Sequence, residues 1–62
     1  MTAPEKQAIS NLRDAYIQLR NLNKESYIKD IEEVKSVFPK LNAKIKQECI
    51  EQIEFLDSLI NQ

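Results

Sequence analysis

A single internal proline interrupts a chain that otherwise has a helical pattern over almost its whole length. Apolar residues recur at three- and four-residue intervals, which is the period of an amphipathic α-helix. Pro39 disfavours the helical conformation of Phe38, the residue before it, so a helix must end there. The sequence therefore predicts an all-α fold with a firm boundary at Pro39, and Pro39 itself is a candidate first residue of the helix that follows.

The first predicted helix covers about residues 3–22 and begins at a capping box. Thr2 is a favourable N-cap, Glu5 lies three residues later, and Pro4 suits the first turn. The apolar stripe that follows consists of Ala8, Ile9, Leu12, Ala15, Tyr16, Leu19 and Leu22. We expect this stripe to face the core.

The second predicted helix covers about residues 25–38, and the segment 21–26 before it is the weakest helix former. Without any glycine in the chain, Asn21 or Asn23 is the expected residue for a left-handed turn conformation. Asn23 or Ser26 would then cap the second helix. The alternative is one continuous, bent first arm, which would make the fold a helical hairpin instead of a three-helix bundle.

The third predicted helix covers about residues 40–61 and is unusually apolar. Its stripe consists of Leu41, Ile45, Cys49, Ile53, Leu56, Leu59 and Ile60. This stripe spans an arc of about 120°, but Ile50 and Phe55 stand on its opposite flanks and widen the arc to about 220°. Short helices of one chain cover so wide an arc poorly, so we expect dimerisation to complete the bundle, unless Ile50 and Phe55 are simply exposed.

Charged residues are ordered along the third helix, with bases in its first half and acids in its second half. The candidate charge-complementary face consists of Lys40, Lys44, Lys46, Glu48, Glu51 and Glu54. The helix macrodipole favours the opposite order by up to about 1 kcal/mol near each end. Two antiparallel copies of this helix would bring basic halves against acidic halves. The alternative is that these exposed charges serve no structural purpose.

The chain of 62 residues predicts one domain, residues 1–62, with little core of its own. Domains of this size bury only about 60% of their unfolded surface and usually need additional stabilisation. Cys49 has no second cysteine to pair with, and there is no histidine for a typical metal site. Self-association or a partner protein is therefore the expected stabilising factor, and no cofactor is expected.

Catalytic patterns are not found, so we expect no enzyme activity. Cys49 lies in the middle of an apolar stripe without a histidine to activate it, which predicts a buried, inert thiol. The acidic row has the pattern of a solvated face. No small-molecule substrate is expected, because the chain has no glycine to build a phosphate-binding loop.

The function that this pattern favours is a small protein-interaction module that regulates, inhibits or chaperones a partner through helix–helix packing. The candidate interaction residues are Ile45, Ile50, Ile53, Phe55, Leu56 and Leu59. The partners expected are a second copy of the chain and another protein. An alternative is a DNA- or RNA-binding regulator that uses the basic start of the third helix, and a further alternative is a structural assembly component.

Nucleic acid is the less favoured partner because the net charge is −1 and not basic. A membrane is not expected either, since no apolar run approaches the roughly 20 residues of a membrane span. The lone cysteine and the absence of a signal-peptide pattern in MTAPEKQ favour a cytoplasmic location.

Overall fold

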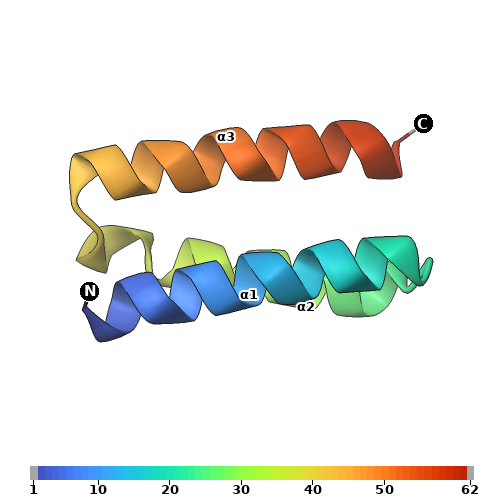
Figure 1. The fold of residues 1–62 in the computed structure, drawn as a ribbon, viewed down its shortest axis with the longest axis horizontal. Coiled ribbons are helices and arrows are strands. Elements are labelled where there is room, and N and C mark those ends of the chain that lie inside the picture. Colours follow the sequence, from blue (N-terminus) through green and yellow to red (C-terminus); the bar gives the residue numbers. More distant parts are fainter. Residues whose placement is uncertain (1, 62) are drawn as a thin grey trace.

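The computed structural model describes residues 2–61 and confirms the all-α fold class. Its helices are α1 (Ala3–Arg20), α2 (Lys24–Ser36) and α3 (Ala43–Ile60), with a short 3₁₀ helix, η1 (Phe38–Lys40), between α2 and α3. Figure 1 shows that α1 and α3 run in the same direction, while α2 lies beside α1, behind it in this view, and runs in the opposite direction. The fold is therefore an up-down-up bundle, and the alternative with one continuous first arm is wrong.

The start of α1 is the one that the sequence predicts. The backbone N–H of Glu5 donates to Oγ1 of Thr2 across 3.4 Å, and Pro4 occupies the first turn. This bond satisfies one of the N–H groups that a helix start leaves without an intrahelical partner.

The end of α1 differs from the prediction, because Leu22 and not an asparagine adopts the left-handed conformation, with φ of 58°. The N–H of Leu22 donates to the carbonyl of Leu19, and the N–H of Asn23 donates to the carbonyl of Gln18. These two bonds form a Schellman motif, in which the residue after the C-cap takes positive φ and is usually glycine. Leucine at this position costs about 1 kcal/mol in backbone strain.

Asn23 has a different role, which explains why the left-handed conformation falls on its neighbour. Its side-chain Oδ1 accepts from the N–H of Ser26 across 3.3 Å and caps α2, as the sequence predicts for this residue. Asn23 makes this bond with a φ of −98°, outside the left-handed region. The tight turn therefore has only Leu22 to supply positive φ between the C-cap of α1 and the N-cap of α2.

The corner at Pro39 is longer than the sequence predicts. The helix α2 ends at Ser36, and Pro39 lies inside η1 instead of beginning α3. Leu41 is extended, and the Oδ1 of Asn42 then accepts from the N–H of Ile45 across 2.9 Å to cap α3. Since this cap fixes the start of α3 at Ala43, the predicted start near residue 40 is wrong.

The core lies along the common axis of the three helices and the Pro39 corner. Its buried apolar residues are Ala8, Ala15, Tyr27, Ile31, Val34, Val37, Cys49, Ile53 and Leu56. Among residues from α1, Ala8 and Ala15 are fully buried, and such small side chains allow α1 and α2 to pack most closely. Asn11, which lies between these two alanines in the sequence, is also buried. Its Nδ2 has no hydrogen-bond partner among residues 2–61.

One polar contact fastens α3 to α2. The hydroxyl of Tyr27 donates to Oδ1 of Asp57 across 2.6 Å in a partly buried setting. Burial raises the pKa of the Tyr27 phenol above its ordinary range, and the hydrogen bond to Asp57 and the negative charge of that residue raise it further. The phenol is therefore a neutral donor to a carboxylate, which is a strong class of hydrogen bond.

Candidate functional site

Side chains of α1 and α3 line two adjoining hollows between these helices. The first has a volume of about 260 Å³ and is lined by Ile9, Leu12, Ile45, Glu48, Cys49 and Gln52. The second has a volume of about 300 Å³ and is lined by Leu12, Arg13, Tyr16, Gln52, Phe55 and Leu56. Because Leu12 and Gln52 border both hollows, the two form one groove, which we call the α1–α3 seam.

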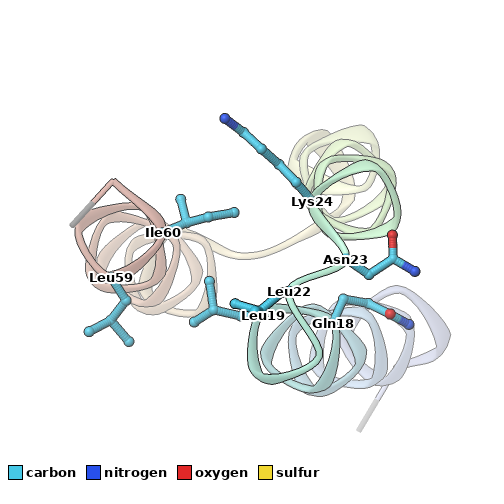
Figure 2. Close-up of a pocket in the computed structure, with 7 residues that line it drawn as sticks. All are labelled: Gln18, Leu19, Leu22, Asn23, Lys24, Leu59 and Ile60. Carbon is cyan, nitrogen blue, oxygen red and sulfur yellow. The ribbon is translucent and has the colours of Figure 1, made fainter.

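A third hollow lies at the end of the bundle where α1 and α3 finish (Figure 2). It has a volume of about 310 Å³ and is lined by Gln18, Leu19, Leu22, Asn23, Lys24, Leu59 and Ile60. Leu19 points from α1 toward α3, and Ile60 points from α3 into the space between the helices (Figure 2). Leu22 at its edge is 91% exposed, so the strained residue of the turn carries an almost fully solvated side chain.

The α1–α3 seam carries large apolar side chains that the rest of the chain leaves uncovered. Ile9 is 39% exposed, Tyr16 is 47% exposed and Phe55 is 56% exposed. Tyr16 and Phe55 border the same hollow from opposite helices. Single exposed apolar residues are common on protein surfaces, but several that gather along one groove make it a candidate interaction surface.

Three of the residues that line the seam carry a charge or an amide group. Arg13 borders one hollow and Glu48 the other, while Gln52 lies between them. Apolar walls with a few polar groups at the rim are typical of grooves that bind apolar side chains of another molecule.

Cys49 borders the seam from below and is a free, buried thiol, as predicted. Burial raises the pKa of this thiol, and the nearby charge of Glu48 raises it further. The thiolate, which is the reactive form, is therefore disfavoured. Within residues 2–61, no group of three or more histidine, cysteine or acidic side chains is arranged to hold a metal ion.

The predicted interaction residues of α3 fall into different environments. Ile53 and Leu56 are buried in the core of the chain itself. Ile45 is half-buried in the seam, and Leu59 is half-buried at the end hollow. Ile50 is also half-buried but borders none of the three hollows, so of this set only Phe55 is strongly exposed. The wide apolar arc is thus largely covered by α1 and α2, apart from its Phe55 flank.

The predicted charge-complementary face is not one surface. Lys40 lies on η1 and not on α3, because the Asn42 cap begins the helix later. Lys44 and Lys46 are two residues apart, a spacing that places side chains on different faces of a helix. The three lysines therefore do not share one face of α3, and their pairing with an acidic surface stays a prediction.

The acidic row is only partly associated with the seam. Glu48 borders it directly, and Glu51 lies three residues further on the same flank of α3. Successive three-residue steps rotate about 60° around a helix, so Glu54 has moved toward the solvent side. All three glutamates are exposed.

Sequence reasoning missed the half of the seam that α1 supplies, namely Ile9, Arg13 and Tyr16. Ile9 and Tyr16 were assigned to the core because they follow Ala8 and Ala15 in one apolar stripe. A signal was present, since each large residue comes directly after a small one, with the same seven-residue spacing. A row of small side chains beside a row of large side chains on one helix indicates one close helix contact and one loosely packed contact.

Comparison with models of known protein families gives no match, and no similar curated protein or solved structure is found. No helix within residues 2–61 is long and apolar enough to cross a membrane.

Proposed function

We propose that this protein is a small non-enzymatic interaction module that regulates, inhibits or chaperones another protein by helix–helix packing. Its working surface is the α1–α3 seam. The observation that carries the proposal is the placement of Tyr16 and Phe55, both about half exposed, on opposite walls of one hollow. These aromatic side chains offer large apolar contact areas to an incoming helix.

The geometry of the seam supports a helix as the incoming element. The two hollows follow each other along the parallel helices α1 and α3. Their centres are displaced by about one helical turn, as judged from the residues that line them. An amphipathic helix presents apolar residues at three- or four-residue intervals, and one turn rises about 5.4 Å. Such a helix places successive apolar side chains in successive hollows and covers the exposed Ile9, Tyr16 and Phe55.

The dimerisation expected from the sequence belongs to the same proposal. A helix of another molecule that covers this groove stabilises the small bundle, because burial of apolar surface contributes about 25 cal/mol per Å². A cytoplasmic setting fits a chain whose single cysteine is free and buried.

The proposal is tested by comparing proteins that co-purify with three tagged forms of the chain from its native host. The first is the wild type, and the second carries Tyr16→Gln and Phe55→Gln in the seam. The third carries Ile17→Gln and Ile28→Gln, which are similarly exposed apolar positions outside the seam. We expect a specific partner to be retained by the wild type and the control and lost from the seam variant.

Loss of a partner from both variants alike, or from neither, would count against the seam. The nucleic-acid alternative is checked on the same proteins by titrating binding to duplex DNA and to RNA against salt. A steep fall of affinity with salt, unchanged by the seam substitutions, would identify phosphate contacts as the main interaction instead.

A further inference from the structure

We propose that in the free protein the α1–α3 seam is covered by a second copy of this chain, related by a two-fold axis that runs along the seam. In this arrangement α1 of each copy lies against α3 of the other copy. The inference rests on the proposed function, because it names an occupant of the same seam. Binding of another protein at the seam then competes with self-association.

The levels of the side chains along the seam support this axis. Tyr16 and Phe55 border the same hollow, so they lie within about one helical turn of the same height on the two parallel helices. A two-fold axis parallel to the helices places the α1 wall of one copy opposite the α3 wall of the other copy. The rotation leaves the position of each residue along the axis unchanged. Each Tyr16 therefore meets the Phe55 side of the other copy, and two aromatic pairs form at the centre of the contact.

The charges on the two walls are complementary under the same exchange. On the α1 wall, Arg13 borders the hollow that holds Tyr16 and Phe55. On the α3 wall, Glu48 borders the neighbouring hollow, and Glu51 lies one turn before Phe55 on the same flank. Exchange of the walls brings each Arg13 to the height of Glu51 on the other copy, which favours this register.

The basic row of α1 meets an acidic residue of the other copy only at its middle member, Arg13. Lys6, Arg13 and Arg20 follow each other at seven-residue intervals and therefore share one flank of α1. In this register Lys6 lies at about the height of Lys44 near the start of α3, so these two exposed basic residues face each other where solvent screens their charges. Opposite charges therefore meet in the middle of the contact, where Arg13 of one copy lies at the height of Glu51 of the other.

The dimensions of the bundle decide between the seam and the end hollow as the contact between copies. A stable interface buries about 800 Å² on each partner, which is less than a fifth of the 4471 Å² that the monomer exposes. The bundle measures 30 × 17 × 15 Å, so a long side offers about twice the area of an end. The seam occupies a long side, whereas the hollow at Leu22 occupies an end.

Charge exchange on separate chains tests the arrangement, with association measured by sedimentation at low salt. We expect the wild type to form dimers as its concentration rises. The variant Arg13→Glu has two acidic walls, and the variant Glu48→Lys with Glu51→Lys has two basic walls. Each variant alone is expected to associate about tenfold more weakly than the wild type. An equimolar mixture of the two is expected to recover wild-type affinity as a heterodimer, because its walls are complementary again.

A crosslink then tests the register directly, in a Cys49→Ala background that removes the native thiol. Tyr16→Cys and Phe55→Cys are placed on separate chains, since within one chain the two positions border the same hollow. The mixture is expected to form a disulfide-linked pair under mild oxidation much faster than either variant alone. Circular dichroism of every variant checks that the helical fold is kept.

The outcomes separate this inference from the proposed function. A wild type that stays monomeric at millimolar concentration would overturn the inference, and so would a charge-exchanged mixture that fails to associate. If the co-purification experiment still shows a partner lost on Tyr16→Gln and Phe55→Gln, the seam binds that protein and not a second copy. If the mixture associates but no partner depends on the seam, the inference stands and the proposed function fails.

Discussion

The contacts that α1 makes with α2 and with α3 use opposite kinds of side chain. On its buried side α1 carries the fully buried Ala8 and Ala15, and among the helix pairs α1 and α2 pack most closely. Toward α3, α1 presents Ile9, Leu12 and Tyr16, and hollows of about 260 and 300 Å³ remain between the helices. Small residues let two backbones approach until no space is left, whereas large side chains hold helices apart and fill the gap incompletely.

This difference shows that the α1–α2 contact is fully packed within the chain, whereas the α1–α3 seam leaves apolar side chains exposed. The α1–α2 hairpin is closed by a Schellman motif and an asparagine cap, and its interface is dense. The seam leaves Tyr16 and Phe55 about half exposed, and α3 is fastened on its other side by the Tyr27–Asp57 hydrogen bond. Stability is thus expected to depend mainly on the hairpin, and binding mainly on the seam.

The largest expected effect comes from filling the close α1–α2 contact. Ala15→Leu adds a branched side chain at a position with no free space, and overpacking of this kind costs typically about 1–3 kcal/mol. We expect a cost of about 3 kcal/mol here, because Ala15 is completely buried. Tyr16→Leu at the next position, on the open seam, is the control and is expected to change the free energy of unfolding by less than about 0.5 kcal/mol. Urea denaturation followed by circular dichroism measures both, and equal effects would contradict the comparison.

The next effect concerns the hydrogen bond that holds α3 to α2. Tyr27→Phe removes the hydroxyl and leaves Asp57 without this donor, which is expected to cost about 1–2 kcal/mol at neutral pH. The raised pKa of Tyr27 makes the same bond pH-dependent. Its stabilisation is complete below the phenol's unfolded pKa of about 10 and is lost as pH rises through the higher folded value.

The pH dependence supplies a control for this variant. Between about pH 10 and 12, the wild type is expected to lose stability more steeply than Tyr27→Phe, so the two unfolding midpoints converge. Parallel curves over this range would show that the phenol is not the group responsible.

A smaller effect of opposite sign is expected at the end of the hairpin. Leu22→Gly removes the left-handed strain and is expected to stabilise the chain by about 1 kcal/mol. The nearly complete exposure of the Leu22 side chain means that little apolar contact is lost in exchange. Thermal unfolding should show a higher midpoint for Leu22→Gly and a lower one for Leu22→Val, because a β-branched residue tolerates positive φ poorly. A lower midpoint for the glycine variant would mean that Leu22 packs against the bundle after all.

The smallest effect follows from like charges that the close hairpin brings together. Burial raises the pKa of Asp30 above its usual range, and the charges of Asp14 on α1 and Glu33 on α2 raise it further. A raised folded pKa means that this carboxyl favours folding when protonated, and that this contribution is lost as pH rises through the folded value.

Replacement of this carboxyl isolates the effect. Asp30→Asn is expected to raise stability at pH 7 by a few tenths of a kcal/mol, and the gain should vanish below the unfolded-state pKa of an aspartate, about 4, where the carboxyl is protonated in both the folded and the unfolded chain. Chemical denaturation at both pH values measures the difference, with Asp57→Asn as a contrast that should destabilise because it weakens the bond to Tyr27.

Local chemistry was the part of the fold that could be predicted well. Thr2 and Asn23 cap their helices as expected, and the break between the second and third helices falls at the Pro39 corner, because each effect involves only a few neighbouring residues. Asn42 was overlooked as a cap since Lys40 and Leu41 extended the apparent helical pattern toward the proline. The buried position of Cys49 also followed from its neighbours at helical spacing.

The candidate site was predicted only in part. Phe55 was correctly placed outside the main stripe of the third helix, and it is strongly exposed. Ile53 and Leu56 were expected to contact a partner, but α1 and α2 bury them within the chain. Periodicity shows which side of a helix is apolar, yet it does not show which neighbouring helix covers each part of that side.

The sequence by itself determined that this chain is helical, that its first helix begins after the Thr2 cap and that Phe55 stands outside the main apolar stripe of the third helix. These properties depend on contacts between residues a few positions apart, which the order of residues states directly. Only the tertiary structure decided that α1 buries its alanines while its larger residues Ile9 and Tyr16 border α3 and stay exposed, and that Leu22 takes the strained position of the turn. Those outcomes depend on how closely whole helices approach, and this distance is set by all the side chains of an interface together.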